Sequence, residues 1–162
     1  MQSQPLTVIR FLGTSPDSSR LVPLLKSICK QVSVGHWLSV DVIPSDTLPL
    51  INFFTSLLSR VATRQRPLFI FLDALDMLSP ADGAHLLAWL PASLPPHCKL
   101  VASVVASHDV IVARLRSLST KMMHVGELGT ALATTILTSW LRKAGRTVTH
   151  EQQDIIDAAL HK

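Results

Sequence analysis

One apolar run that ends at two acids constrains the fold of this chain more than any other feature. Residues 68–72 read Leu-Phe-Ile-Phe-Leu, and Asp73 and Asp76 follow. A run without polar alternation is typical of a strand in a parallel sheet that is covered on both faces. Because open α/β sheets bind ligands at the carboxyl ends of their strands, Asp73 is expected at such an edge, where a carboxylate can hold Mg²⁺. Taken alone, however, an acid after an apolar strand is more often a turn former or a helix N-cap.

The composition indicates one globular domain with much apolar surface. Of the 162 residues, 48% are hydrophobic and 16% are charged, which is more apolar than is usual for a soluble domain. No apolar stretch approaches the length of about 18 residues that a membrane-spanning helix requires, and residues 1–5 do not resemble a signal peptide. We therefore expect no membrane association, and we interpret the excess apolar surface as a contact for protein partners or for self-association.

Charge and cysteine content argue against two further classes of function. The net charge is +4, but the basic residues are scattered and are not interleaved with aromatic residues, so no specific binding of nucleic acid is expected. Cys29 and Cys98 are too few for a disulfide framework or a metal cluster. They are typical of core thiols in a reducing compartment, and we expect the protein to be cytoplasmic.

Strand and helix patterns alternate along the first part of the chain. Strands are expected at residues 6–12, 68–72, 99–105 and 122–125, and helices at 21–34, 48–63, 81–90 and 108–118. Such alternation predicts an α/β fold with a parallel sheet and right-handed crossovers. After Gly129 only helices are expected, at 130–144 and 149–160, and Thr149 with Gln152 predicts a capping box at the start of the last one. The all-helical end predicts a small second module.

Three segments, taken in order, resemble a known family. Residues 8–19 read Val-Ile-Arg-Phe-Leu-Gly-Thr-Ser-Pro-Asp-Ser-Ser and precede a Leu-rich helix, residues 68–76 hold the two acids, and residues 125–153 form the helical end. Together they resemble the NACHT-type (STAND) P-loop NTPases of signalling, most closely those that carry WD or tetratricopeptide repeats. Residues 68–76 are similar to the Walker B segment of that family.

The resemblance implies a fold. It implies that residues 1–125 are a partial NACHT-like nucleotide-binding domain with a three-layer parallel sheet, holding strands two to five of the family. It also implies that residues 126–162 are the start of a helical lid, and that strand 68–72 lies between strands 6–12 and 99–105.

The resemblance also implies roles for single residues. Asp73 would serve Mg²⁺, and Asp76 would position or activate the attacking water. Ser103 is the best match to the polar sensor residue that contacts bound nucleotide, although a hydroxyl there also fits a purely local hydrogen bond. The cofactors implied for the full-length family are ATP or ADP with Mg²⁺.

One element of the family is missing from this sequence. A phosphate-binding loop, the Walker A motif, needs Gly-x-x-x-x-Gly-Lys-Ser/Thr, and none of the six glycines is followed by Lys. The strand before that loop is missing too, and in the family it lies between the strands assigned here to 99–105 and 122–125. We therefore expect this chain alone to bind no nucleotide tightly and to be inactive as an NTPase, with open sheet edges that favour association.

These observations leave one reading and two alternatives. The reading is a segment of a nucleotide-dependent signalling switch that holds Walker B acids without the phosphate-binding loop. One alternative is a noncatalytic interaction or scaffold module, and the other is a Mg²⁺-dependent phosphohydrolase. Ser107, His108 and Asp109 contain the residue types of a catalytic triad, but neighbours in sequence do not face each other as a nucleophile and its base must.

Overall fold

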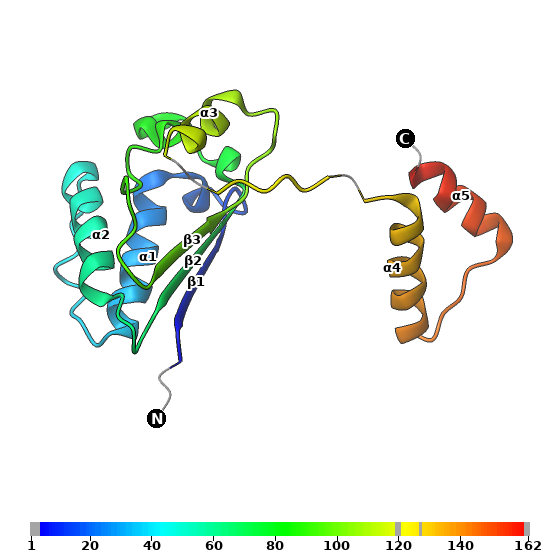
Figure 1. Cartoon of the computed structure of the whole chain (residues 1–162), viewed down its shortest axis with the longest axis horizontal. Helices are drawn as coiled ribbons and strands as arrows, with labels where there is room; N and C mark the ends of the chain where they lie inside the picture. The colour runs from blue at the N-terminus through cyan, green and yellow to red at the C-terminus, as the bar shows by residue number, and fades with distance from the viewer. Residues whose placement is uncertain (1–3, 119–120, 127, 161–162) are drawn as a thin grey trace. The chain divides into compact units, whose positions relative to one another are not determined.

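The computed structural model describes residues 4–118, 121–126 and 128–160. The chain divides into two compact units, Met1–Lys121 and Met122–Lys162, which are described here one at a time (Figure 1). The outer limits of the two predicted domains, residues 1 and 162, lie outside the described residues. No helix within the described ranges is long and apolar enough to cross a membrane.

A three-stranded parallel sheet forms the centre of the first unit. Its strands are β1 (Leu6–Phe11), β2 (Leu68–Asp73) and β3 (Cys98–Ala102), in the order β1-β2-β3. The predicted α/β class, and the predicted place of residues 68–72 between the other two strands, are confirmed.

Two helices cover one face of this sheet. Helices α1 (Leu21–Gly35) and α2 (Thr47–Val61) lie on the same side of the strands in Figure 1. Their apolar residues recur at helical spacing, so each helix turns one stripe toward the sheet. The core that results contains, among others, Val8, Leu25, Ile28, Phe54, Leu58, Leu68, Ile70 and Leu72.

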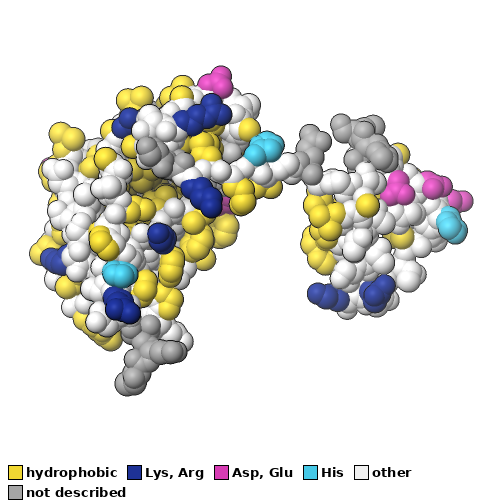
Figure 2. Space-filling view, viewed as in Figure 1, with side chains coloured by type: hydrophobic (Ala, Val, Ile, Leu, Met, Phe, Trp, Pro, Cys, Tyr) yellow, Lys and Arg dark blue, Asp and Glu magenta, His cyan; other side chains and the backbone are white. Residues whose placement is uncertain are grey.

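Within the described residues of the first unit, the opposite face of the sheet is not covered. Along β2, the side chains of Leu68, Ile70 and Leu72 are buried, whereas that of Phe71 is exposed. Ile9, Phe11 and Val101 are exposed on the same face as Phe71, and hydrophobic side chains line the strands in Figure 2. The unbroken apolar run suggested a strand buried on both faces, but within the described residues of the first unit the helices lie over only one face.

The prediction of an α-helix at residues 81–90 is wrong. It forms the 3₁₀ element η3 (Ala81–Leu86), in which Asp82 and Gly83 have φ of 57° and 67°, and Leu87 follows with φ of 51°. Left-handed residues cannot continue a right-handed helix. The buried Trp89 stabilises the turn instead, because its Nε1–H donates to the carbonyl of Ala84 at 2.9 Å.

The strand predicted at 122–125 is also wrong. Residues 121–126 have no regular secondary structure, and Met122, Met123 and Val125 are exposed. A strand needs a neighbour with which to exchange hydrogen bonds, and β3 is the last strand of the sheet in the described residues. The sheet therefore has three of the four predicted strands.

The remaining elements agree with the sequence patterns. Short 3₁₀ turns are η1 (Asp17–Ser19) and η2 (Leu75–Met77), and α3 spans Asp109–Ser117. In the second unit, α4 spans Thr130–Lys143 and α5 spans His150–Leu160. The predicted capping box is present: the N–H of Thr149 donates to Gln152 Oε1 at 3.0 Å, and the N–H of Gln152 donates to Thr149 Oγ1 at 3.3 Å.

Candidate functional site

Asp73 and Ser103 meet at the carboxyl edge of the sheet. Asp73 ends β2, and the register that pairs Leu72 with Ala102 places Ser103 beside it. The hydroxyl of Ser103 donates to Asp73 Oδ1 at 2.5 Å. Both residues lie at one edge, because the carboxyl ends of parallel neighbouring strands point the same way.

A left-handed turn at Ala74 follows Asp73 directly. Ala74 has φ of 67° and ψ of 64°, a conformation that costs an L-residue about 1–2 kcal/mol. Two hydrogen bonds to Ser103 hold the turn: the N–H of Ala74 donates to Ser103 Oγ at 2.7 Å, and the N–H of Leu75 donates to the carbonyl of Ser103 at 2.9 Å. Ser103 therefore fixes both the Asp73 carboxylate and the backbone after it.

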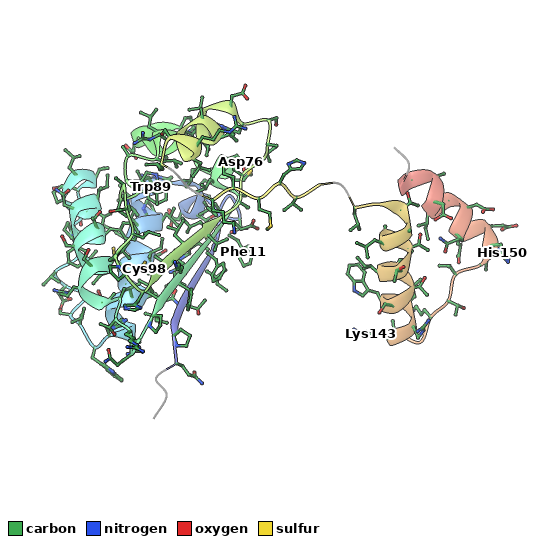
Figure 3. The ribbon with its side chains drawn as sticks, in the orientation of Figure 1. Phe11, Asp76, Trp89, Cys98, Lys143 and His150 are labelled. Atoms are coloured by element: carbon green, nitrogen blue, oxygen red, sulfur yellow. The ribbon has the colours of Figure 1, made fainter. Side chains whose placement is uncertain are left out.

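Asp76 braces the loop that leaves β3. It lies in η2, near the carboxyl ends of the strands (Figure 3). Its Oδ1 accepts the N–H of Val105 at 3.0 Å. The two acids thus make different contacts, Asp73 with a side chain and Asp76 with the backbone. The first contact joins the end of β2, and the second joins η2, to the residues that follow β3.

The site offers a metal ion few protein ligands. Within the described ranges there is no group of three or more His, Cys, Asp or Glu side chains that could hold a metal. One or two carboxylates suffice for Mg²⁺ when waters and substrate phosphates complete its octahedron. Asp73, exposed and oriented by Ser103, fits one position of such an octahedron. The sequence holds no glycine-lysine loop for the phosphates.

Residues 107–109 form a helix cap and not a catalytic triad. His108 precedes α3, and its Nδ1 accepts the N–H of Ile111 at 3.5 Å. The His108 ring packs edge-on against His85 at a centroid distance of 4.8 Å. His85 Nε2 lies 2.6 Å from the carbonyl of Leu78. Both imidazoles therefore serve local structure.

The two cysteines are core thiols, as predicted. Both are buried and free. Burial raises the pKa of Cys29 to about 12 and that of Cys98 to about 11. A thiol with so high a pKa holds its proton at neutral pH and is a poor nucleophile or metal ligand.

The contacts of Ser103 and Asp76 could not be read from the sequence. They depend on the left-handed Ala74, and alanine gives no signal for that conformation, which glycine and asparagine usually adopt. The one signal available was the spacing of three residues between Asp73 and Asp76, which fits a single tight turn.

Comparison with known proteins gives a consistent set of relatives. Over 99% of its length the chain is 36% identical to human NACHT and WD repeat domain-containing protein 2, of which it covers 9%. It is 39% identical over 60% of its length to human NACHT domain- and WD repeat-containing protein 1, of which it covers 6%. Rat tetratricopeptide repeat protein 41 is 27% identical over 63% of the chain, which covers 8% of that protein. The chain thus spans less than a tenth of the length of these relatives.

Two other comparisons gave no match. No family model matches the chain, and no solved structure matches it.

Proposed function

This chain is a relative of the NACHT proteins that carry WD repeats, and from that relationship we propose that it contributes the acidic edge of a nucleotide-dependent signalling switch. The observation that carries the proposal is the contact of Asp73 with Ser103 at the carboxyl ends of β2 and β3. This is where open α/β sheets bind their ligands.

The residues of the chain have distinct roles in this proposal. Asp73 would hold Mg²⁺, which would neutralise phosphate charge when bound. Ser103 positions the Asp73 carboxylate by donating to one of its oxygens. Asp76 accepts the N–H of Val105 with one oxygen, and the carboxylate has further lone pairs that can accept a hydrogen from a water. Asp76 is therefore the proposed residue that orients water.

The proposal gives this chain no tight nucleotide site of its own. In phosphate-binding loops, backbone N–H groups and a Lys supply most of the binding energy for the phosphates. This sequence has no such loop. We propose that ATP or ADP with Mg²⁺ is bound only where the phosphates are held by another segment. We place this function in the cytoplasm, where buried free thiols such as Cys29 stay reduced.

Mn²⁺ is a direct probe of the proposed metal position. Mn²⁺ takes oxygen ligands as Mg²⁺ does, and it broadens the NMR signals of nearby amides. We expect selective broadening of the Asp73, Ala74 and Ser103 amides, lost in Asp73→Asn. Asp82→Asn removes an exposed acid elsewhere and is the matched control. Broadening that survives Asp73→Asn, or that Asp82→Asn abolishes, contradicts the proposal.

A second candidate function is a noncatalytic interaction module. The uncovered apolar face of the sheet favours it, because contiguous exposed apolar surface usually marks a binding site. The WD and tetratricopeptide repeats in the names of the relatives support a role among protein assemblies. The third alternative, a Mg²⁺-dependent phosphohydrolase, gains no support from the few acids at the site.

A further inference from the structure

We propose that Trp37 and the turn at residues 63–66 form a docking site for a partner protein, and that the docked segment is acidic and carries a large apolar side chain. The inference goes beyond the functions proposed above. It uses neither the acidic edge nor the uncovered face of the sheet, so each proposal can fail without the other.

Trp37 occupies a position at which glycine is usually found. Helix α1 ends in a Schellman motif: the N–H of Trp37 donates to the carbonyl of Val34 at 3.1 Å, and the N–H of Leu38 donates to that of Ser33 at 2.9 Å. The first residue after the cap of such a motif is left-handed, and Trp37 has φ of 56°. Glycine adopts this conformation freely, whereas a residue with a Cβ is strained in it.

The side chain of Trp37 contributes little to the fold in return. It is 92% exposed, and its indole N–H makes no hydrogen bond within the described residues. Strained residues that persist in a fold cluster at sites that bind ligands or partners, and Trp is among the residues most enriched at the energetic centres of protein interfaces. The position of Trp37 is therefore explained by a partner that covers it.

Other exposed apolar side chains flank Trp37 in the sequence. Val34, in the last turn of α1, is 63% exposed, and Val42, in the loop that follows, is 61% exposed. Exposed apolar side chains beside an aromatic anchor favour contact with an apolar side chain of a partner.

The turn at residues 63–66 lies beside this end of α1. A Cβ on Gly35 would lie 2.9 Å from Leu6 Cδ2, and the N–H of Leu6 donates to the carbonyl of Pro67 at 2.9 Å. Burial lowers the pKa of His36, and the positive charge of Arg66 lowers it further. The Arg66 guanidinium therefore lies near the residue that precedes Trp37.

This turn carries positive charge that the fold does not neutralise. The N–H of Arg66 donates to the carbonyl of Thr63 at 3.1 Å, and Arg64 between them is exposed. Neither guanidinium forms a hydrogen bond or an ion pair within the described residues. Residues 47–72 contain no acid, and the first acid after Trp37 is Asp41. Figure 2 shows Lys or Arg side chains and a His near one another toward the end of the first unit at which the strands begin.

The strand that the family resemblance expects in addition does not account for this exposed surface. That strand is expected beyond β3, whereas Leu6 and Pro67 lie at the amino ends of β1 and β2. The docking site also lies at the end of the helix layer that already covers one face of the sheet. Described elements alone therefore form the site.

Charge and shape together favour an acidic protein segment over other anionic partners. A guanidinium pairs with a carboxylate through two parallel hydrogen bonds. Membrane-binding segments carry about four to eight clustered basic residues, and single-stranded nucleic acids bind where successive bases stack on several aromatic side chains. This site has two arginines and one tryptophan, which fit one or two carboxylates next to an apolar side chain.

Fluorescence anisotropy of a labelled peptide tests the proposal. The probe is a synthetic peptide in which Glu residues flank a central pair of Leu, and its two controls replace Glu by Lys or Leu by Ser. The full-length chain should bind the probe and neither control, and added salt should weaken the binding. No binding of the probe, or equal binding of either control, overturns the proposal. Tighter binding of single-stranded DNA or of phosphatidylserine vesicles overturns it as well.

Trp37→Gly separates docking from folding. Because glycine is favoured at this left-handed position, the variant should raise the midpoint of urea unfolding, reported by the fluorescence of the buried Trp89. The same variant should weaken binding of the probe at least about tenfold. A lower urea midpoint would show that Trp37 stabilises the fold, and unchanged binding would show that it is no anchor; either result overturns the proposal.

The second unit offers a matched pair of control variants. Trp140 is 67% exposed in α4, and Arg142 is exposed two residues later. Arg64→Glu should weaken binding of the probe at least about tenfold, whereas Trp140→Ala and Arg142→Glu should leave it unchanged. Asp73→Asn should also bind as wild type, which separates docking from the proposed metal site. Equal losses in Arg64→Glu and Arg142→Glu would mean that only net charge matters, and the proposal would fail.

Discussion

Ser103→Ala tests whether the acidic edge is built around this hydroxyl. The hydroxyl donates to Asp73 at 2.5 Å and accepts from Ala74 at 2.7 Å. A hydrogen bond contributes about 0.5–1.5 kcal/mol to stability when neutral and about 1.5–3 kcal/mol when one partner is charged. Because Ser103 and Asp73 are exposed, water replaces part of each bond in the variant. We therefore expect Ser103→Ala to lower the free energy of unfolding by about 1–2 kcal/mol.

Urea unfolding followed by tryptophan fluorescence measures this loss in the first unit. Trp89 is buried there, whereas Trp37 and Trp140 are exposed and change little on unfolding. Ser107→Ala is the matched control, because Ser107 is an exposed serine nearby whose hydroxyl makes no hydrogen bond in the described residues. It should stay within about 0.5 kcal/mol of wild type. Equal stability of the two variants at the same protein concentration refutes the reasoning.

Three further outcomes are expected. Calorimetry with Mg-ATP should detect weak binding or none. Binding with a micromolar dissociation constant that is lost in Asp73→Ala would contradict the proposal that this chain lacks a phosphate-binding loop. Gly13→Ala should lower the free energy of unfolding by at least about 1 kcal/mol, because φ is +76° and the new Cβ would lie 2.7 Å from Met77 Cβ; unchanged urea stability would contradict this. The free energy of unfolding should fall as the pH rises above about 9. Above that pH the thiols of the unfolded chain ionise, whereas the folded Cys29 and Cys98, with pKa raised to about 12 and about 11, keep their protons. Cys29→Ala should reduce the dependence of the free energy of unfolding on pH, measured by urea titration at each pH.

The sequence predicted the parts of the fold that burial decides. Residues 6–12, 68–72 and 99–105 were expected as strands, and the structure has β1, β2 and β3 there. Their ends differ from the predicted ones by at most one residue, except that β3 stops at Ala102, three residues early. The long helices were found for the same reason, since apolar spacing records which side of a segment faces the core.

The sequence failed where a local conformation or a missing neighbour decides. At residues 81–90 the helical pattern is overridden by the left-handed Asp82, Gly83 and Leu87, of which only the glycine is a recognisable signal. At 122–125 the residue types suit a strand, but no described strand is available to pair with them. The apolar run at 68–72 could not reveal that one face of the sheet is uncovered within the described residues of the first unit, because a run of this kind has the same composition in either case.

At the candidate site, the positions of the residues along the sheet edge could be predicted, but their hydrogen bonds could not. The predicted order of parallel strands is enough to bring the residues after 68–72 and after 99–105 to one edge of the sheet. The hydrogen bonds depend on the turn at Ala74. This turn allows Ser103 to donate to Asp73 and Asp76 to accept the N–H of Val105. The roles assigned to these three side chains in nucleotide chemistry stay predictions.

Strand β3 carries the acidic edge at its carboxyl end and is the last described strand of the sheet. Its carboxyl end leads directly to Ser103, which orients Asp73 and holds the turn at Ala74. On its outward edge, Leu100 and Ala102 make no main-chain hydrogen bond beyond the sheet within the described residues. The strand is only five residues long, and on its inner side it is held by β2 alone. Any strand that paired with this outer edge would restrain the same short segment that positions Ser103.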